Sequence, residues 1–265
     1  MSKSKLIGML ILLSVFLGGA LLFGAAGIGE ANSPEGSEKN YGNWQFTPTL
    51  RQNKDLLFEV ATTEKLIALT FDDGPDESTE EILDVLNKYN VRATFFVVGK
   101  NCLERVDTLK RIALEGHEVG NHTYTHPKFR AKSREQISQE LEKTSEVIFK
   151  IINSVPQYFR PPGGTINLRI LEAAKAAHLR VVLWTPEEDS KDWQNPGVTT
   201  IVRNVIKRAK GGSIILMHDG GGARKQTKDA LPRIIEQLEA DGYQFVTLSE
   251  LVHAKDSLPV EKIKF

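Results

Sequence analysis

Two adjacent carboxylates stand where a short apolar run ends, in the stretch Thr70-Phe71-Asp72-Asp73-Gly74-Pro75. Aspartate and glycine both favour turns and helix starts, so a turn or a cap would account for one aspartate at this place. A second adjacent carboxylate needs another explanation, because ionised carboxylates act as general bases and as metal ligands. Asp72 and Asp73 are therefore candidates for chemistry.

Two histidines four residues apart form a second candidate, in Asn121-His122-Thr123-Tyr124-Thr125-His126-Pro127. They lie on one face if this stretch is helical. Imidazole is the commonest metal ligand among side chains that titrate near neutral pH. Two histidines and one carboxylate leave coordination positions open, which a catalytic metal site requires and a structural zinc site lacks. We therefore predict a catalytic metal site that includes His122 and His126.

Three further groups lie at the ends of apolar runs. Arg160 stands in Phe159-Arg160-Pro161-Pro162-Gly163-Gly164. It is permanently charged and can bind a carboxylate through two hydrogen bonds. A plain surface turn explains this stretch equally well. The stretch Asp189-Ser190-Lys191-Asp192-Trp193 follows another such run. His218 ends an almost wholly apolar run, and we interpret it as an acid or a base rather than as a buried structural histidine.

Short apolar segments alternate with helix-like segments from Lys65 onward, which predicts a parallel sheet with helices outside it. The predicted strands are Leu66–Phe71, Ala93–Val98, Glu118–Gly120, Gln157–Arg160, Arg180–Trp184, Ser213–Met217 and Gln244–Thr247. The predicted helices include Glu80–Lys88, Arg134–Ile151, Leu168–Ala177, Thr199–Ala209 and Asp229–Ala240.

This α/β pattern, with about seven strands, suits a barrel or a near-barrel. In such folds the reactive residues lie at the carboxyl ends of the strands. The candidate residues above cluster at or just after the ends of predicted strands, which supports both the fold and the site.

The N-terminal segment predicts export. Lys3 and Lys5 precede an uncharged stretch from Leu6 to Gly29, which reaches the ~20 residues that cross a bilayer. We favour an uncleaved membrane anchor over a cleaved signal peptide, and either one places the rest of the chain outside the cytoplasm. The predicted organisation is a signal anchor or signal peptide over 1–30, a linker and lead-in over 31–60, a catalytic domain over 61–254 and a tail over 255–265.

Composition excludes some classes of protein. Basic and acidic residues number 34 each, so no basic excess indicates a nucleic-acid partner. Cys102 is the single cysteine, which excludes an intramolecular disulfide and a cysteine metal site. We expect Cys102 to be a small, partly buried residue, because free cysteine usually behaves as a hydrophobic side chain.

The chain from about Lys65 to Val252 resembles the polysaccharide deacetylases of carbohydrate esterase family 4, also called the NodB homology domain. Each motif alone is weakly specific, but all five family motifs appear in order. They are Thr-Phe-Asp-Asp-Gly-Pro, His-Thr-Tyr-Thr-His, Arg-Pro-Pro-Gly-Gly, Asp-Ser-Lys-Asp-Trp and Ile-Leu-Met-His.

The resemblance implies a distorted (β/α) barrel and a role for each matched residue. It implies a divalent metal, with zinc favoured and cobalt or manganese open, held by Asp73, His122 and His126. It implies Asp72 as general base, Arg160 as the residue that orients the base, His218 as general acid and Asp192 as the partner of His218. The backbone N–H of Gly163 would bind the oxyanion, and Trp193 and Leu216 would line the pocket for the acetyl group.

The resemblance also implies a hydrolase that releases acetate from an N-acetylglucosamine polymer. We favour peptidoglycan as the substrate, and expect a monomer that faces the cell wall. The same site could serve O-acetylated xylan, chitin oligomers or poly-N-acetylglucosamine. A non-catalytic carbohydrate-binding domain of this fold is the alternative from another class, but the presence of Asp72 and His218 argues against it.

Overall fold

The computed structural model describes residues 53–186 and 188–256 of the chain. The predicted anchor, residues 1–30, lies outside this part, as do residues 31–52 of the predicted linker and nearly all of the tail. Within the described part, none of the helices has both the length and the apolar composition required to span a bilayer.

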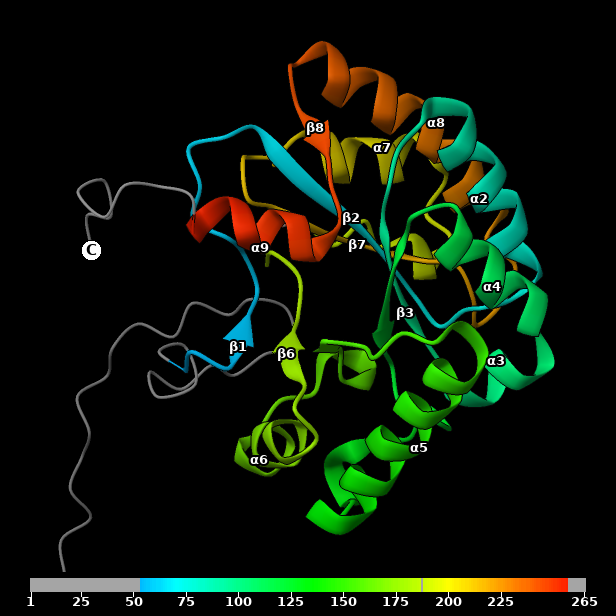
Figure 1. Cartoon of the computed structure of the whole chain (residues 1–265). Coiled ribbons are helices and arrows are strands. Elements are labelled where there is room, and N and C mark those ends of the chain that lie inside the picture. Colours follow the sequence, from blue (N-terminus) through cyan, green and yellow to red (C-terminus); the bar gives the residue numbers. More distant parts are fainter. Residues whose placement is uncertain (1–52, 187, 257–265) are drawn as a thin grey trace, which may run out of the picture. The chain divides into compact units, whose positions relative to one another are not determined.

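Parallel strands build the sheet, in agreement with the predicted α/β class. Its order is β1-β6-β5-β4-β3-β2-β7, and β8 pairs with β2. All pairings are parallel, and the sheet is curled with helices around it (Figure 1). The strands are β1 Leu56–Leu57, β2 Leu66–Asp72, β3 Thr94–Val97, β4 Glu118–Asn121, β5 Tyr158–Phe159, β6 Arg180–Val182, β7 Ile214–His218 and β8 Gln244–Phe245.

The register of the sheet brings the candidate residues together. Asp72 is paired with His218 on β7 and with Phe96 on β3, so the carboxylate doublet and the candidate acid end neighbouring strands at the same level. Asn121, the residue before His122, is paired with Phe159, the residue before Arg160. The carboxyl ends of these strands therefore supply a single site, as predicted.

The helices form where capping residues and apolar spacing agree. Asp76 and Thr79 form a capping box at the start of α2, and Ser133 and Gln136 form another at the start of α5. The helices are α2 Glu77–Tyr89, α3 Gly99–Glu104, α4 Val106–Leu114, α5 Arg134–Ile152, α6 Leu168–Ala176, α7 Val198–Ile206, α8 Lys225–Ala240 and α9 Leu248–Asp256, with 3-10 turns η1 Phe129–Ala131, η2 Pro162–Gly164 and η3 Asp192–Gln194.

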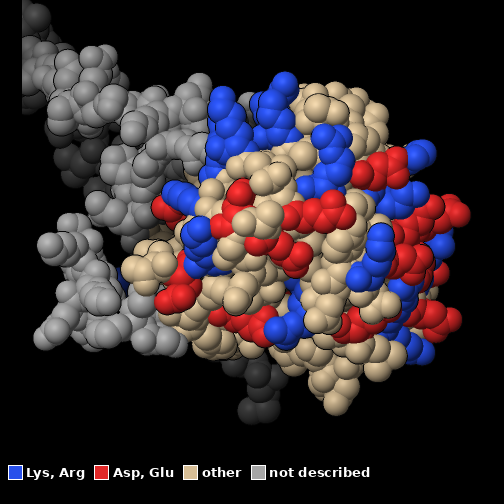
Figure 2. All heavy atoms as spheres, turned by 90° about the horizontal axis from the view of Figure 1, so that it is seen from above, with Lys and Arg blue, Asp and Glu red and all other residues tan. Residues whose placement is uncertain are grey.

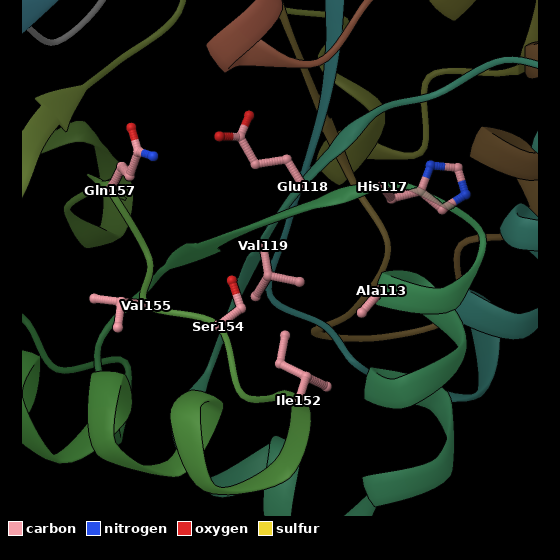
Figure 3. Close-up of a pocket in the computed structure, with 8 residues that line it drawn as sticks. All are labelled: Ala113, His117, Glu118, Val119, Ile152, Ser154, Val155 and Gln157. Carbon is pink, nitrogen blue, oxygen red and sulfur yellow. The ribbon is translucent and has the colours of Figure 1, made fainter.

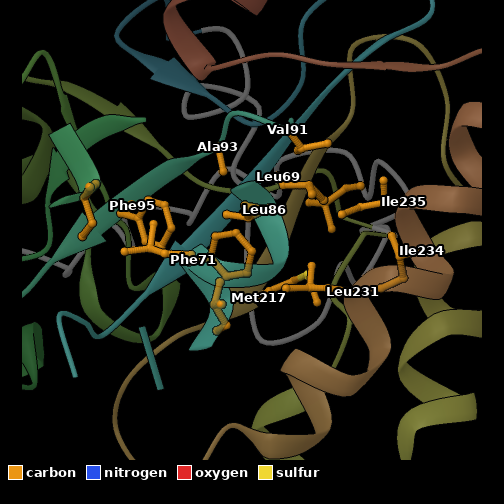
Figure 4. Close-up of a cluster of buried hydrophobic side chains, with 14 of the residues drawn as sticks. Leu69, Phe71, Leu86, Val91, Ala93, Phe95, Met217, Leu231, Ile234 and Ile235 are labelled. Carbon is orange, nitrogen blue, oxygen red and sulfur yellow. The ribbon is translucent and has the colours of Figure 1, made fainter. Parts of the chain in front are cut away.

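Buried apolar side chains from the sheet and from α2 and α8 form the largest core cluster (Figure 4). Phe71 on β2 stacks on Phe95 on β3, with ring centroids 5.1 Å apart. Met217, from β7, and Leu231, from α8, are both fully buried in this cluster. Because burial of apolar surface is the main favourable contribution to folding, this cluster holds β2 and β7 rigidly at the ends that carry the candidate residues.

The segment after β6 approaches β7 without forming a regular strand. The Thr185 N–H donates to the Ile214 carbonyl at 3.0 Å, and the Leu216 N–H donates to the Glu188 carbonyl at 3.0 Å. Asp189 forms an isolated parallel bridge with Leu216. The described sheet is thus a curled half-barrel whose β6 side is connected to β7 through irregular backbone.

Candidate active site

The doublet divides into two differently placed carboxylates. Asp72 is the last residue of β2 and is 4% exposed. Asp73 follows it with φ of 79°, in the left-handed region that residues other than glycine rarely adopt. Successive side chains of a strand point to opposite faces of the sheet. The left-handed backbone at Asp73 also changes the direction of its side chain relative to that of Asp72. The two carboxylates therefore meet different partners.

The loop that carries the two histidines is not helical, so the helical interpretation of their spacing was wrong. Thr123 and His126 have φ of 71° and 53°. The Asn121 side chain accepts a hydrogen bond from the Thr123 N–H, the Thr123 hydroxyl accepts one from the His126 N–H, and Glu140 accepts two more from the loop backbone. These side chains compete with helical hydrogen bonds for the backbone N–H groups, and the loop folds around them.

The loop nevertheless brings both rings to Asp73. The Nε2 atoms of His122 and His126 lie 3.3 Å and 3.2 Å from Asp73 Oδ1. One ligand atom from each of the three residues lies within 4.8 Å of the others. His122 Nδ1 lies 2.7 Å from the Arg160 carbonyl oxygen, to which it can donate, so Nε2 is left as the acceptor. The donor set fits a divalent cation.

The charges around this set also favour a cation. Burial would raise the pKa of Asp73, but hydrogen bonds from His122 and His126 and the charges of His122 and His218 outweigh burial and hold that pKa well below its usual range. Burial would lower the pKa of His122, but the carboxylates of Asp72 and Asp73 outweigh burial and raise it. Two carboxylates that stabilise a proton on an imidazole would equally stabilise a metal ion in its place.

Arg160 is fully buried and holds Asp72. Its Nη1 donates to Asp72 Oδ1 at 2.8 Å and to Thr70 Oγ1 at 2.8 Å. Its Nη2 donates to the Leu183 carbonyl at 2.9 Å, and its guanidinium carbon lies 4.1 Å from the centre of the Phe96 ring. These contacts fix the position of Asp72 Oδ1 and leave Oδ2 3.9 Å from His122 Nε2, beside the three candidate ligands.

His218 and Asp192 form a second buried pair. Asp192 Oδ1 lies 2.7 Å from His218 Nδ1, and Asp192 Oδ2 accepts hydrogen bonds from the His218 N–H and the Thr227 hydroxyl, both at 2.8 Å. Burial lowers the pKa of His218, but the hydrogen bond and the charge of Asp192 outweigh burial and raise it to about 9. His218 is therefore a cation at neutral pH and can donate a proton.

The predicted pocket residues lie close in the chain to these groups. Leu216 is on β7, two residues before His218, and is 3% exposed. Trp193 follows Asp192 in η3 and is 51% exposed. Gly163, in η2, is exposed and has φ of 61°. These three residues come from three separate elements, and the acetyl pocket stays a prediction.

A cavity of about 270 Å³ at the opposite end of β4 contains none of the predicted site residues (Figure 3). It includes His117, whose Nδ1 accepts a hydrogen bond from the Ala93 N–H at 3.1 Å and whose pKa burial lowers to about 4. His117 therefore has a structural role. Cys102 is fully buried, which is more than the partial burial expected from the sequence.

Four polar residues that support the site escaped sequence interpretation. Thr70 contacts Arg160, Thr227 contacts Asp192, and Asn101 and Asp219 hold the turn after β2. Asp219 alone carried a local signal, because it directly follows His218 at a strand end.

The comparisons agree on one kind of protein. Residues 59–182 match the family model described as polysaccharide deacetylase. A curated peptidoglycan-N-acetylglucosamine deacetylase of Bacillus cereus is 44% identical over 199 residues, which make up 75% of this chain and 93% of that relative. The crystal structure of the Bc1960 peptidoglycan N-acetylglucosamine deacetylase is 37% identical, with a TM-score of 0.75 over 78% of this chain and 98% of that one. A family 4 acetyl xylan esterase from Clostridium thermocellum, solved with a cobalt ion, is 36% identical, with a TM-score of 0.68 over 73% of this chain and 93% of that one.

Proposed function

Because this chain belongs to the polysaccharide deacetylase family and is therefore a hydrolase, we propose that it removes N-acetyl groups from a cell-wall polymer in a metal-dependent reaction. The observation that carries the proposal is the convergence of three metal-ligand atoms beside one anchored carboxylate, with a charged histidine at the end of the neighbouring strand. A carbohydrate-binding domain would have no use for this acid, base and ligand set.

Asp73, His122 and His126 would hold the divalent metal. When bound there, such an ion polarises the amide carbonyl and lowers the pKa of water. Zinc is our first choice because imidazole nitrogen and carboxylate oxygen both suit it, and cobalt is the ion in the related esterase. This donor set also accepts manganese.

Two buried pairs would move the protons. Asp72, which accepts a hydrogen bond from Arg160, takes a proton from the attacking water. His218, held as a cation by Asp192, donates a proton to the departing sugar nitrogen. Acetate and a free amine result. The Gly163 N–H would bind the developing oxyanion, and Trp193 and Leu216 would enclose the acetyl methyl group.

Replacing Asp192 by Asn is expected to shift the alkaline limb of the pH–activity profile to lower pH. Asn keeps the shape of the side chain and removes the charge that raises the pKa of His218 to about 9. Protonated His218 is the active form, so activity is present below its pKa and is lost as the pH rises through it. We expect the limb to move down by about one pH unit or more, as measured by kcat/KM. An unchanged limb would contradict the assignment of His218 as the acid.

Peptidoglycan is the polymer that we favour, on the strength of the relatives and of a basic surface segment. Residues 127–134 contain Lys128, Arg130, Lys132 and Arg134 and no acidic residue, although the whole chain has zero net charge. On the face seen in Figure 2, by comparison, basic and acidic side chains are interspersed. Among the described residues, Arg134 alone of these four has an ion pair, with Glu172 at 3.9 Å.

This basic segment directly follows the candidate ligand His126. Phe129 is fully buried against Phe159, with ring centroids 6.2 Å apart, which anchors the segment while Lys128 and Arg130 on either side are exposed. Peptidoglycan carries carboxylates on its peptide groups, whereas chitin and xylan backbones are neutral. The basic segment would therefore favour peptidoglycan.

The double variant Lys128→Glu/Arg130→Glu is expected to raise KM for soluble peptidoglycan fragments roughly tenfold and to leave kcat within about twofold, because exposed charges contribute up to about 1 kcal/mol each. Its KM for neutral chitin oligomers should stay unchanged. Lys110→Glu, at an exposed site on α4, is the matched control. Equal effects on both substrates would contradict a role in recognising charge.

Acetate release from purified peptidoglycan, chitin oligomers and acetylxylan would separate the candidate substrates. We expect the highest kcat/KM on peptidoglycan. A higher value on acetylxylan would make the chain an esterase that uses the same site, as its similarity to the Clostridium thermocellum enzyme allows.

We also propose an extracytoplasmic, monomeric enzyme that residues 1–30 anchor in the membrane or export. The uncharged stretch in this segment supports the proposal. We propose further that the half-barrel corresponds to the distorted barrel of the family, with the irregular segment after β6 in place of a closing strand. The hydrogen bond from the Thr185 N–H to the Ile214 carbonyl and the one from the Leu216 N–H to the Glu188 carbonyl support this correspondence.

A further inference from the structure

A single peptide group, between Asp73 and Gly74, is held at both of its polar atoms by buried or half-buried side chains. Asn101 Nδ2 donates to the Asp73 carbonyl oxygen at 2.9 Å. Asp219 Oδ1 accepts a hydrogen bond from the Gly74 N–H at 3.1 Å. Because one peptide group is planar, these two contacts fix its orientation and therefore the ψ angle of Asp73.

The backbone at Asp73 needs such support. Its φ of 79° is unfavourable for a residue with a Cβ, and such conformations persist where the surroundings impose them. Asp219 is itself fully buried, and its Oδ2 accepts a hydrogen bond from the Thr79 hydroxyl at 2.7 Å. A Cβ on Gly74 would lie 2.0 Å from Asp219 Oδ2, so the close approach of the carboxylate requires glycine at this position.

Asp219 also connects the two strand ends that carry the chemistry. Its backbone N–H donates to the Asp72 carbonyl at 3.0 Å, and it directly follows His218. We infer that Asn101 and Asp219 are positioning residues, which hold the Asp73 carboxylate in the direction that a metal ion requires. This inference rests on the proposed metal site, and neither residue is assigned contact with substrate.

Zinc affinity, measured by competition with a chromophoric chelator, tests the inference without any need for turnover. Asp219→Ala leaves the Gly74 N–H without its acceptor, and we expect zinc to bind about 10- to 100-fold more weakly, as for other residues that orient metal ligands. Asp219→Asn keeps an oxygen that can accept from the Gly74 N–H, and should restore affinity to within about threefold of the wild type. The visible spectrum of the cobalt-loaded protein should change in Asp219→Ala and recover in Asp219→Asn.

Asn101→Ala is a second variant for the same zinc-affinity measurement. The variant lies at a half-buried position, so misfolding is a smaller risk than at Asp219. It removes the other contact of the same peptide group and should weaken zinc binding several-fold. The double variant Asn101→Ala/Asp219→Ala should lose less affinity than the product of the two single losses, because residues that hold one group are coupled. Ile148→Val, which removes one methyl group from the core on α5, is the control for a general loss of stability.

Wild-type zinc affinity in folded Asp219→Ala and in Asn101→Ala would overturn the inference. If Asp219→Ala does not fold, wild-type affinity in Asn101→Ala alone overturns it. Equal weakening of zinc binding by Ile148→Val would overturn it too, because the effect would then follow stability. Failure of the wild-type protein to bind zinc or cobalt would instead contradict the proposed function, so the two failures are distinguishable.

Discussion

Asp72→Asn is expected to lower kcat by about 10²- to 10⁴-fold, the range that general acid–base catalysis contributes. The side chain is 5% exposed and accepts a hydrogen bond from Arg160 at 2.8 Å, and an asparagine oxygen can keep that bond. The amide cannot take a proton from water at neutral pH. The variant should therefore fold, and should bind zinc through the unaltered Asp73, His122 and His126.

Three measurements on this variant separate catalysis from structure. The melting temperature and the zinc content should stay near those of the wild type, while turnover on peptidoglycan falls. Asp107→Asn, at a side chain that is fully exposed, is the matched control and should retain full turnover. Normal turnover in Asp72→Asn would show that Asp72 is not the base, and loss of zinc would show that it is a ligand.

Removal of the metal has the second large expected effect. His126 is the most exposed of the three candidate ligands, with a side chain 42% exposed, and asparagine tolerates its φ of 53°, so His126→Asn should fold normally. We expect its zinc affinity to fall by at least about tenfold and its turnover at limiting zinc to fall with it, with partial recovery in excess zinc. His178→Asn is the control, because His178 is exposed and asparagine tolerates its φ of 56°.

An unchanged zinc affinity in His126→Asn would remove His126 from the ligand set. A loss of affinity with unchanged turnover at limiting zinc would contradict metal dependence itself. Zinc affinity and turnover at limiting zinc must therefore both fall if the proposal is correct.

The sequence predicts the strands and their reactive ends well, because both depend on local patterns. Apolar runs such as Ser213–Met217 mark buried parallel strands, and the observed strand, Ile214–His218, is displaced by one residue. Since parallel strands all end at one edge, residues that directly follow them converge whatever the order of the strands. The prediction that Asp72, His122, Arg160 and His218 meet needed no knowledge of strand order.

Features that depend on contacts distant in the chain could not be predicted. The loop between His122 and His126 has helical spacing, but Glu140 on α5 binds its backbone, and no local pattern indicates this. Strand β1 is two residues long and exists because it pairs with β6. Helices α3 and α4, six and nine residues long, were not among the predicted helices, and α9 follows the last predicted strand without a break.

The positioning residues escaped prediction for the same reason. Asn101 lies 28 positions from Asp73 in the chain, and Asp219 lies 145 positions from Gly74. Their roles arise from the pairing of β2 with β7 and from the path of α3. Such contacts are set by the tertiary fold, whereas the reactive residues themselves are marked by their types and by their places at strand ends.

Acetate release from purified peptidoglycan, before and after removal of bound metal by a chelator, tests the central claim most directly. The proposal predicts that the metal-free protein stays folded and releases no acetate, and that one equivalent of zinc or cobalt restores the activity. Full acetate release from protein that elemental analysis shows to be free of metal would contradict it.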